Sequence, residues 1–220
     1  MLPPSDITFD LGILLGHFYS WQFFLPIGLL PLHPPDSNIT VGSTKMGPAI
    51  KMSLPNARPY SFNFPLATTA FIIIDMQRDF VDPNGFGSVQ CGNPEIFSSV
   101  RSIVPTVQAV LEVARYMGMQ IIHTREGHRP DLSDLPAAKK LRQVSAPDGH
   151  HTMGIGDKGP MGRLLVRGEW GHDIIEELSL HPGELVVDKP GKGSFWATGL
   201  HRLLLSRGIT HLIFAGVTTE

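Results

Sequence analysis

Four short apolar runs, rich in β-branched residues, recur along this chain and limit its folds more than any other feature. They cover 70–74, 119–123, 185–188 and 211–215. Amphipathic stretches separate them, and alternating strand and helix patterns are typical of βαβ units around a parallel sheet. The sequence therefore predicts an α/β fold in which helices cover both faces of a mostly parallel, Rossmann-like sheet, in three layers.

The stretches between these runs carry helix and loop signals. Residues 96–114 place apolar side chains at helical spacing, and Gly118 follows as a C-terminal cap. Pro105 either starts the main helix of this stretch or kinks it. Thr198 is placed to cap a later helix. Residues 124–169 are rich in proline and glycine and are predicted to form a long loop region, which in a compact domain usually has a function.

At 220 residues, with 42% hydrophobic residues and a net charge of -2, the chain suits one soluble domain plus additional sequence. We assign the domain to 55–220 and an extension to 1–54. The sequence has no basic stripe and no basic residues interleaved with aromatic ones, which argues against nucleic-acid binding. The single cysteine, Cys91, excludes an internal disulfide and favours a reducing compartment, and hence the cytoplasm.

The extension contains an uncharged run, 11–32, that is long enough to cross a bilayer. His17, Gln22 and Pro26 interrupt this run, and no positive charge precedes it. We therefore expect 1–54 to be a disordered or docked extension, or mispredicted upstream sequence. Membrane anchoring through 11–32 is the alternative.

Polar residues directly follow three of the four apolar runs. Asp75 and Gln77 follow the first, Lys189 follows the third, and Gly216 begins a polar turn after the fourth. In a doubly wound sheet, ligands bind outside the carboxyl ends of the strands, so these residues are expected to meet in one crevice. A carboxylate there can take up and return a proton. A neighbouring ammonium favours the ionised form of a thiol, whose unperturbed pKa is about 8.5.

Three segments of the chain resemble, in order, three signatures of the isochorismatase-like cysteine hydrolases. They are Asp75-Met76-Gln77-Arg78-Asp79-Phe80, Lys189 followed by Gly193-Ser194-Phe195, and Gly216-Val217-Thr218-Thr219-Glu220. The resemblance covers about 55–220, and the segment His123 to Asp131 is most similar to the arm of the family that cleaves biuret and related ureides. It implies a small amide or ureide substrate, a homo-oligomer in the complete family form, and no metal or organic cofactor.

The resemblance also implies a catalytic Asp-Lys-Cys triad. Asp75 and Lys189 match its first two members, because aligning the segment from Gly193 favours Lys189 over the nearby Lys192. The family cysteine stands two places after the residue that matches Glu220, where this sequence ends. We therefore expect a C-terminally incomplete fold and no activity from the chain by itself. The alternative is an inactive fragment or pseudoenzyme with a binding or scaffold role, whose last strand is an unpaired edge.

Further site residues follow from the same comparison of motifs. Gln77 and Lys192 are candidates for substrate contact. Arg125 and His128 follow the second strand at the same edge and carry donors suited to a urea-like carbonyl, although a loop held by its own salt bridges explains them equally well. The Val217–Thr218 bond matches one that is often cis in the family, where it directs backbone N–H groups to the substrate carbonyl as an oxyanion hole.

Other classes of function fit the sequence less well. A dinucleotide-binding protein needs a glycine-rich turn after the first strand, and 76–79 has none. The segment 190–193 lacks the spacing of a phosphate-binding loop. Some relatives, such as nicotinamidases, bind zinc with an Asp-x-His pattern, but 125–128 does not match it, so no metal site is predicted.

Overall fold

The computed structural model describes residues 50–91, 94–142 and 154–218. The candidate membrane segment 11–32 lies outside them. Within the part of the chain that the structure describes, no helix is both long enough and apolar enough to cross a bilayer.

The chain divides into two compact units, Met1–Pro65 and Leu66–Glu220. The described part of the first unit contains an antiparallel hairpin of β1 (Lys51–Leu54) and β2 (Phe62–Pro65). All the residues predicted to form the site belong to the second unit.

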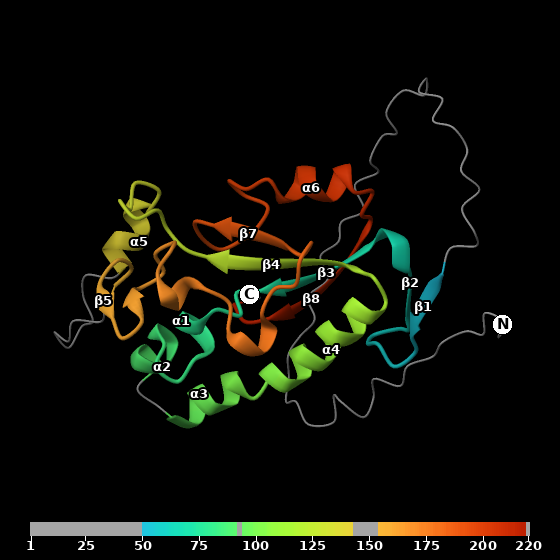
Figure 1. Ribbon diagram of the computed structural model, residues 1–220, viewed down its shortest axis with the longest axis horizontal. Helices are drawn as coiled ribbons and strands as arrows, with labels where there is room; N and C mark the ends of the chain where they lie inside the picture. The colour runs from blue at the N-terminus through green and yellow to red at the C-terminus, as the bar shows by residue number, and fades with distance from the viewer. Residues whose placement is uncertain (1–49, 92–93, 143–153, 219–220) are drawn as a thin grey trace, which may run out of the picture. The chain divides into compact units, whose positions relative to one another are not determined.

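The second unit is built on a four-stranded parallel sheet with the spatial order β7-β4-β3-β8 (Figure 1). Its strands are β3 (Thr69–Ile74), β4 (Gln120–Glu126), β7 (Leu185–Lys189) and β8 (His211–Gly216). These are the four apolar runs of the sequence, so the predicted α/β class is confirmed. β4 continues three residues past the predicted end at His123, because its pairing with β7 extends to the register pair Glu126 and Lys189.

A short helix precedes the sheet, and helices and a small hairpin connect its strands. The elements are η2 (Leu66–Thr68), α1 (Arg78–Val81), α2 (Phe86–Cys91), α3 (Pro94–Arg101), α4 (Val104–Tyr116), α5 (Ala137–Arg142), β5 (Lys158–Gly159), β6 (Gly162–Arg163), η3 (Trp170–His172), η4 (Glu176–Leu178) and α6 (Leu200–Ser206). Pro105 starts a helix rather than kinking one, since it lies in the first turn of α4, where its missing N–H costs no hydrogen bond. The prediction of one long loop over 124–169 is corrected, because the segment contains the end of β4, α5 and the β5–β6 hairpin.

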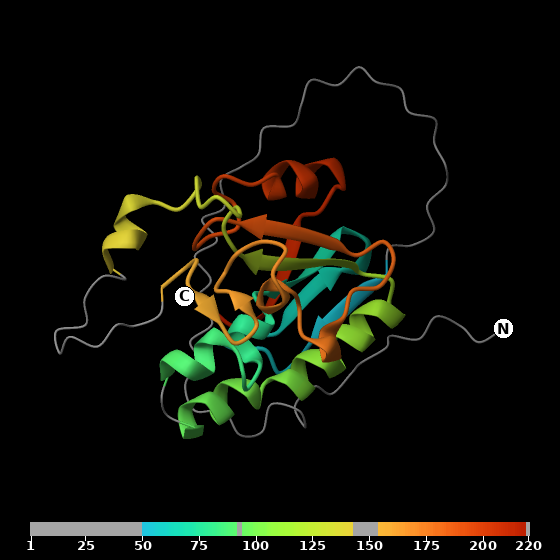
Figure 2. The same ribbon diagram turned by 60° about the vertical axis from the view of Figure 1, so that its left-hand side comes forward.

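Helices cover both faces of the sheet, as a three-layer fold requires. On one face, Leu111 and Ala114 of α4 share a core with Phe71 of β3. On the other face, Leu204 of α6 shares a core with Ile72. Figures 1 and 2 both show α4 and α6 on opposite sides of the sheet. Because β3 is covered on both faces, it is a continuous apolar run rather than an alternating one.

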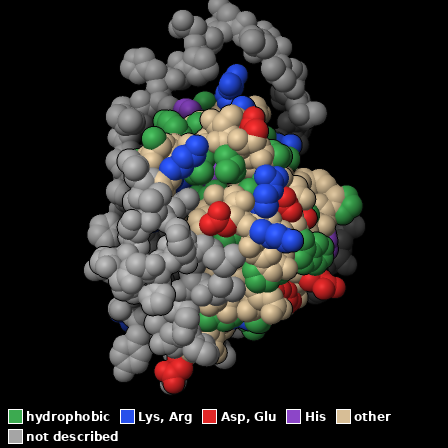
Figure 3. All heavy atoms as spheres, turned by 90° about the vertical axis from the view of Figure 1, so that its left-hand side faces the viewer, with side chains coloured by type: hydrophobic (Ala, Val, Ile, Leu, Met, Phe, Trp, Pro, Cys, Tyr) green, Lys and Arg blue, Asp and Glu red, His purple; other side chains and the backbone are tan. Residues whose placement is uncertain are grey.

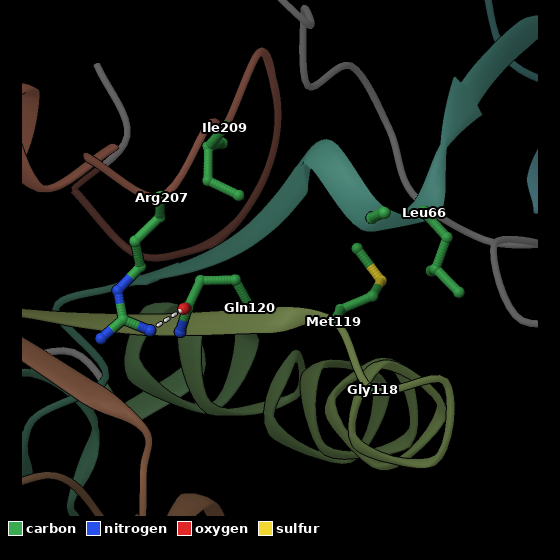
Figure 4. A pocket seen from close by; sticks show the side chains of 7 residues that line it. Leu66, Gly118, Met119, Gln120, Arg207 and Ile209 are labelled. Carbon is green, nitrogen blue, oxygen red and sulfur yellow. Dashed lines mark hydrogen bonds between the residues drawn. The ribbon is translucent and has the colours of Figure 1, made fainter. Parts of the chain in front are cut away.

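A hollow of about 440 Å³ lies at the amino-terminal edge of this sheet. Gly118, Met119 and Gln120, at the start of β4, line one part of it (Figure 4). Arg207 lines another part and donates a hydrogen bond to the Gln120 side chain at 2.5 Å. Since Asp75 and Lys189 follow the carboxyl ends of their strands, this hollow is not the place where the candidate catalytic residues meet.

Candidate active site

Asp75 follows β3 directly and is fully buried. Its φ of 49° lies in the left-handed region, which costs a non-glycine residue on the order of 1–3 kcal/mol and persists only where the surroundings enforce it. Thr124 of β4 provides much of that constraint. Its carbonyl accepts the Asp75 N–H at 3.1 Å, and its hydroxyl donates to Oδ1 at 2.8 Å. Thr218, just after β8, donates its hydroxyl to Oδ2 at 2.5 Å, so residues from both neighbouring strand ends hold the carboxylate.

Lys189, the last residue of β7, brings a buried ammonium to the same carboxylate. Its Nζ lies 2.7 Å from Oδ2 of Asp75 and 3.3 Å from Oε2 of Glu126, and it donates to the carbonyl of Gly191 at 3.1 Å. An ammonium has three N–H donors, so each has an acceptor here. Removing one partner of a buried ion pair leaves an uncompensated charge. The structure thus brings Asp75 and Lys189 together at the carboxyl edge of the sheet.

Two residues that the sequence analysis missed complete this group of charges. Glu126 ends β4 and is the cross-strand register partner of Lys189. Lys139 of α5 lies 2.6 Å from Oε1 of Glu126, and its ammonium also reaches Nε2 of His128 at 3.3 Å and the carbonyl of Pro190 at 3.2 Å. Extending the second strand would have put Glu126 on the same face as Thr124. No sequence signal indicates Lys139, because its position depends on the path of a loop.

Electrostatics keep Glu126 ionised and His128 neutral. Burial would raise the pKa of the Glu126 carboxyl, but the hydrogen bond from Lys139 and the charge of Lys189 together hold its pKa below its usual value. Burial, followed by the charge of Lys139, lowers the pKa of His128. The neutral imidazole therefore accepts from Lys139 at Nε2 and donates from Nδ1 to Asp134 at 3.2 Å.

Gln77 is fully buried, and its side chain joins backbone segments. Its amide nitrogen donates to the carbonyls of Glu126 and His172, both at 2.9 Å. Its oxygen accepts the N–H of Glu126 at 2.7 Å. All three hydrogen bonds go to main-chain atoms, so in this structure Gln77 fixes the end of β4 and presents no free polar group to a ligand.

The other residues predicted for substrate contact lie in different places. Arg125 is on the sheet face opposite Thr124 and Glu126 and pairs with Asp188 at 2.8 Å and Asp173 at 2.6 Å. The structure therefore does not bring Arg125 to the Asp75–Lys189 pair. His128 is fully buried against Lys139, whereas Lys192 is exposed in the turn after β7.

The turn after β8 approaches β3 very closely. The N–H of Val217 donates to the carbonyl of Ile74 at 3.0 Å, so it pairs with the sheet. The Val217–Thr218 bond is trans, since the only cis peptide among the described residues is Arg58–Pro59, and this corrects the expected cis bond. Thr218 instead has a φ of 53°, which places a second strained residue beside Asp75.

The charges on this side of the molecule are mixed. Figure 3, which faces the carboxyl ends of the strands, shows basic and acidic side chains next to one another on the visible described surface. Over the described ranges, 50–91, 94–142 and 154–218, no group of three or more His, Cys, Asp or Glu side chains is placed to hold a metal ion.

Comparison with known proteins gives consistent matches. The isochorismatase domain model matches residues 69–220. The ureidoacrylate amidohydrolase RutB of Yersinia enterocolitica is 29% identical over 169 residues, which cover 75% of this chain and 70% of that protein. The ureidoacrylate amidohydrolase RutB of Pantoea ananatis is 32% identical over 167 residues, which cover 74% of this chain and 64% of that protein.

The fold of this chain resembles that of a solved structure. The cysteine hydrolase from Pseudomonas syringae pv. phaseolicola is 25% identical, with a TM-score of 0.54, over 71% of this chain and 62% of that chain. This chain thus spans less than two thirds of the Pantoea protein and of the Pseudomonas structure.

Proposed function

This chain belongs to the isochorismatase family, and on that basis we propose that it hydrolyses a C–N bond of a small amide or ureide by a cysteine-dependent mechanism. One observation carries the proposal: the buried carboxylate of Asp75 and the ammonium of Lys189 lie 2.7 Å apart at the carboxyl edge of the sheet. The names of the two RutB relatives support a ureide as the substrate class.

The proposed reaction uses Asp75 as general base and general acid. Its carboxylate takes the proton of a thiol, and the thiolate attacks the substrate carbonyl carbon. The C–N bond breaks as Asp75 returns the proton to the leaving amine, which leaves a thioester. Asp75 then takes a proton from water, and the hydroxide attacks the thioester carbon. The C–S bond breaks, which releases the acid, and Asp75 returns the proton to the thiolate. Lys189, 2.7 Å from Asp75, holds the carboxylate in place and stabilises the thiolate by its positive charge.

The nucleophile in this proposal is not Cys91. That residue, the single cysteine of the 220, is the last residue of α2 and follows none of the strands that deliver Asp75 and Lys189. We therefore expect residues 1–220 alone to have no turnover that depends on Asp75. The second candidate is a binding or scaffold role without hydrolysis.

An activity assay tests the proposal directly. The chain is extended with the segment that follows the aligned region in the Pantoea relative, with a cysteine placed two positions after Glu220, and ammonia release is measured with biuret, ureidoacrylate-type amides and nicotinamide. We expect release from a ureide, with a loss of about 10²- to 10⁴-fold in Asp75→Asn and a comparable loss in Lys189→Met.

The matched control carries serine in place of the added cysteine and should be inactive. Turnover by unmodified 1–220 that disappears in Asp75→Ala would refute the requirement for a thiol outside these residues. An extended chain that binds a ureide without releasing ammonia would favour the binding role.

A further inference from the structure

Two lysines and two carboxylates near the sheet edge form two short ion pairs. Asp75 and Lys189 are 2.7 Å apart, and Glu126 and Lys139 are 2.6 Å apart. A longer contact of 3.3 Å joins Lys189 to Glu126. Lys189 is therefore shared unequally, closer to the proposed catalytic carboxylate than to its cross-strand neighbour.

Glu126 is a direct competitor for the Lys189 ammonium. The two residues are register partners on adjacent parallel strands, so their side chains leave the same face of the sheet side by side. Glu126 is also nearly buried, with 7% of its surface exposed, and little water is present to screen its charge. A carboxylate in this position attracts Lys189 strongly unless another cation neutralises it.

Lys139 is placed to neutralise it. Its three N–H donors have three acceptors, which are Oε1 of Glu126, Nε2 of His128 and the carbonyl of Pro190. Pro190 directly follows Lys189, so Lys139 also fixes the backbone that carries the catalytic ammonium. Burial would raise the pKa of Glu126, but the hydrogen bond from Lys139 and the charge of Lys189 lower it, which agrees with this arrangement.

We propose that Lys139 is a positioning residue, which holds the competing carboxylate of Glu126 and thereby keeps Lys189 on Asp75. The four charges sum to zero with Lys139 present. Without its charge, two buried carboxylates and one ammonium remain. The Lys189 ammonium then moves toward Glu126 and interacts with both carboxylates. The inference rests on the proposed function for the role of Lys189, but the geometry itself can be measured without turnover.

The experiment follows the Lys189 ammonium by ¹H–¹⁵N spectroscopy of lysine-labelled protein, residues 1–220, near neutral pH. The resonance is assigned by its loss in Lys189→Arg. We expect Lys139→Met to shift the Lys189 ¹⁵Nζ resonance at least twice as far as Lys140→Met does. Lys140 is the matched control, because it is the next residue in α5 and is exposed. In the double variant Glu126→Gln, Lys139→Met, the resonance should match that of Glu126→Gln alone, because the competing charge is then absent.

A purely structural role gives a different pattern. If Lys139 only anchors α5, its loss shifts the Lys189 resonance equally in the wild-type and Glu126→Gln backgrounds, and that result overturns the proposal. An unchanged Lys189 resonance in Lys139→Met overturns it as well. Where Lys139→Met is too unstable to label, Lys139→Gln replaces it in both backgrounds, because it also removes the charge. None of these readouts uses activity, so an inactive enzyme with the predicted shifts would contradict the proposed function while leaving this inference intact.

Discussion

At the scale of single residues, the candidate site stores backbone strain in two residues whose side chains touch each other. Asp75 and Thr218 both have left-handed backbone conformations, and the Thr218 hydroxyl donates to the Asp75 carboxylate. Three donors converge on this carboxylate, from Thr124, Thr218 and Lys189. Together they fix the orientation of both carboxylate oxygens at the end of β3.

His172 is a second residue whose surroundings determine its charge. It ends η3, is 1% exposed, and its Nε2 has no hydrogen-bond partner among the described residues. Burial, followed by the charge of Arg125, lowers its pKa from 6.5 to about 4. Its backbone carbonyl accepts a hydrogen bond from Gln77, so the residue lies directly behind the end of β4.

This histidine predicts how stability depends on pH. Between pH 6.5 and about 4, His172 binds a proton in the unfolded chain but not in the folded one. The contribution of neutral His172 to the free energy of unfolding is therefore complete above pH 6.5. It is lost as the pH falls toward 4, and the loss is on the order of 3 kcal/mol. The free energy of unfolding is measured by urea denaturation of wild type and His172→Gln from pH 4.5 to 7.5. Plotted against pH, it should have a smaller slope in the variant, by an amount that corresponds to about one bound proton.

His201 provides the control for this measurement, because it is exposed on α6. His201→Gln should keep the wild-type slope. Parallel curves for wild type and His172→Gln would contradict the assignment of a low pKa to His172.

At the scale of secondary-structure elements, the approach of β8 to β3 depends on Gly216. Its φ is 126°, and a Cβ built there would lie 2.2 Å from the carbonyl oxygen of Ile74, its register partner. Gly216→Ala must therefore push the end of β8 away from β3. Overpacking and the unfavourable φ together should reduce the free energy of unfolding by roughly 2 to 4 kcal/mol, measured by urea denaturation.

The same substitution should also affect the site, since Thr218 follows two residues later and would lose its contact with Asp75. Gly208→Ala separates the two effects, because Gly208 has a φ of 65° but no atom within 4 Å of a built Cβ. It should reduce stability by only about 1 to 2 kcal/mol. Equal losses in both variants would show that close packing at Gly216 is not important.

The elements also show which parts of the site the sequence could predict. The apolar runs determined the strands, so the positions of Asp75 and Lys189 at strand ends could be predicted from the sequence. The end of β4 could not, because Thr124, Arg125 and Glu126 are polar and belong to the strand only through their pairing with β7. That error hid the alternation that places Thr124 and Glu126 on the site face and Arg125 on the other.

At the scale of the whole molecule, the sheet and both of its cores come from residues after Pro65. The compact unit begins at Leu66 and the family match at residue 69. The boundary predicted from the sequence lies at 55, where the composition changes. A boundary at 55 separates β1, which ends at Leu54, from its partner β2. Composition alone does not show this pairing.

We therefore predict that the folding domain begins at Leu66. A domain of about 150 residues buries enough surface to fold by itself, whereas an isolated strand such as β2 without β1 contributes little. Thermal unfolding of polypeptides 66–220, 55–220 and 1–220 should give midpoints within about 4 °C of one another, as expected for differences below 1 kcal/mol. The Lys189 ammonium resonance should also be the same in all three. A polypeptide 66–220 that unfolds without a cooperative transition, beside a cooperative 1–220, would show that the first 65 residues complete the core.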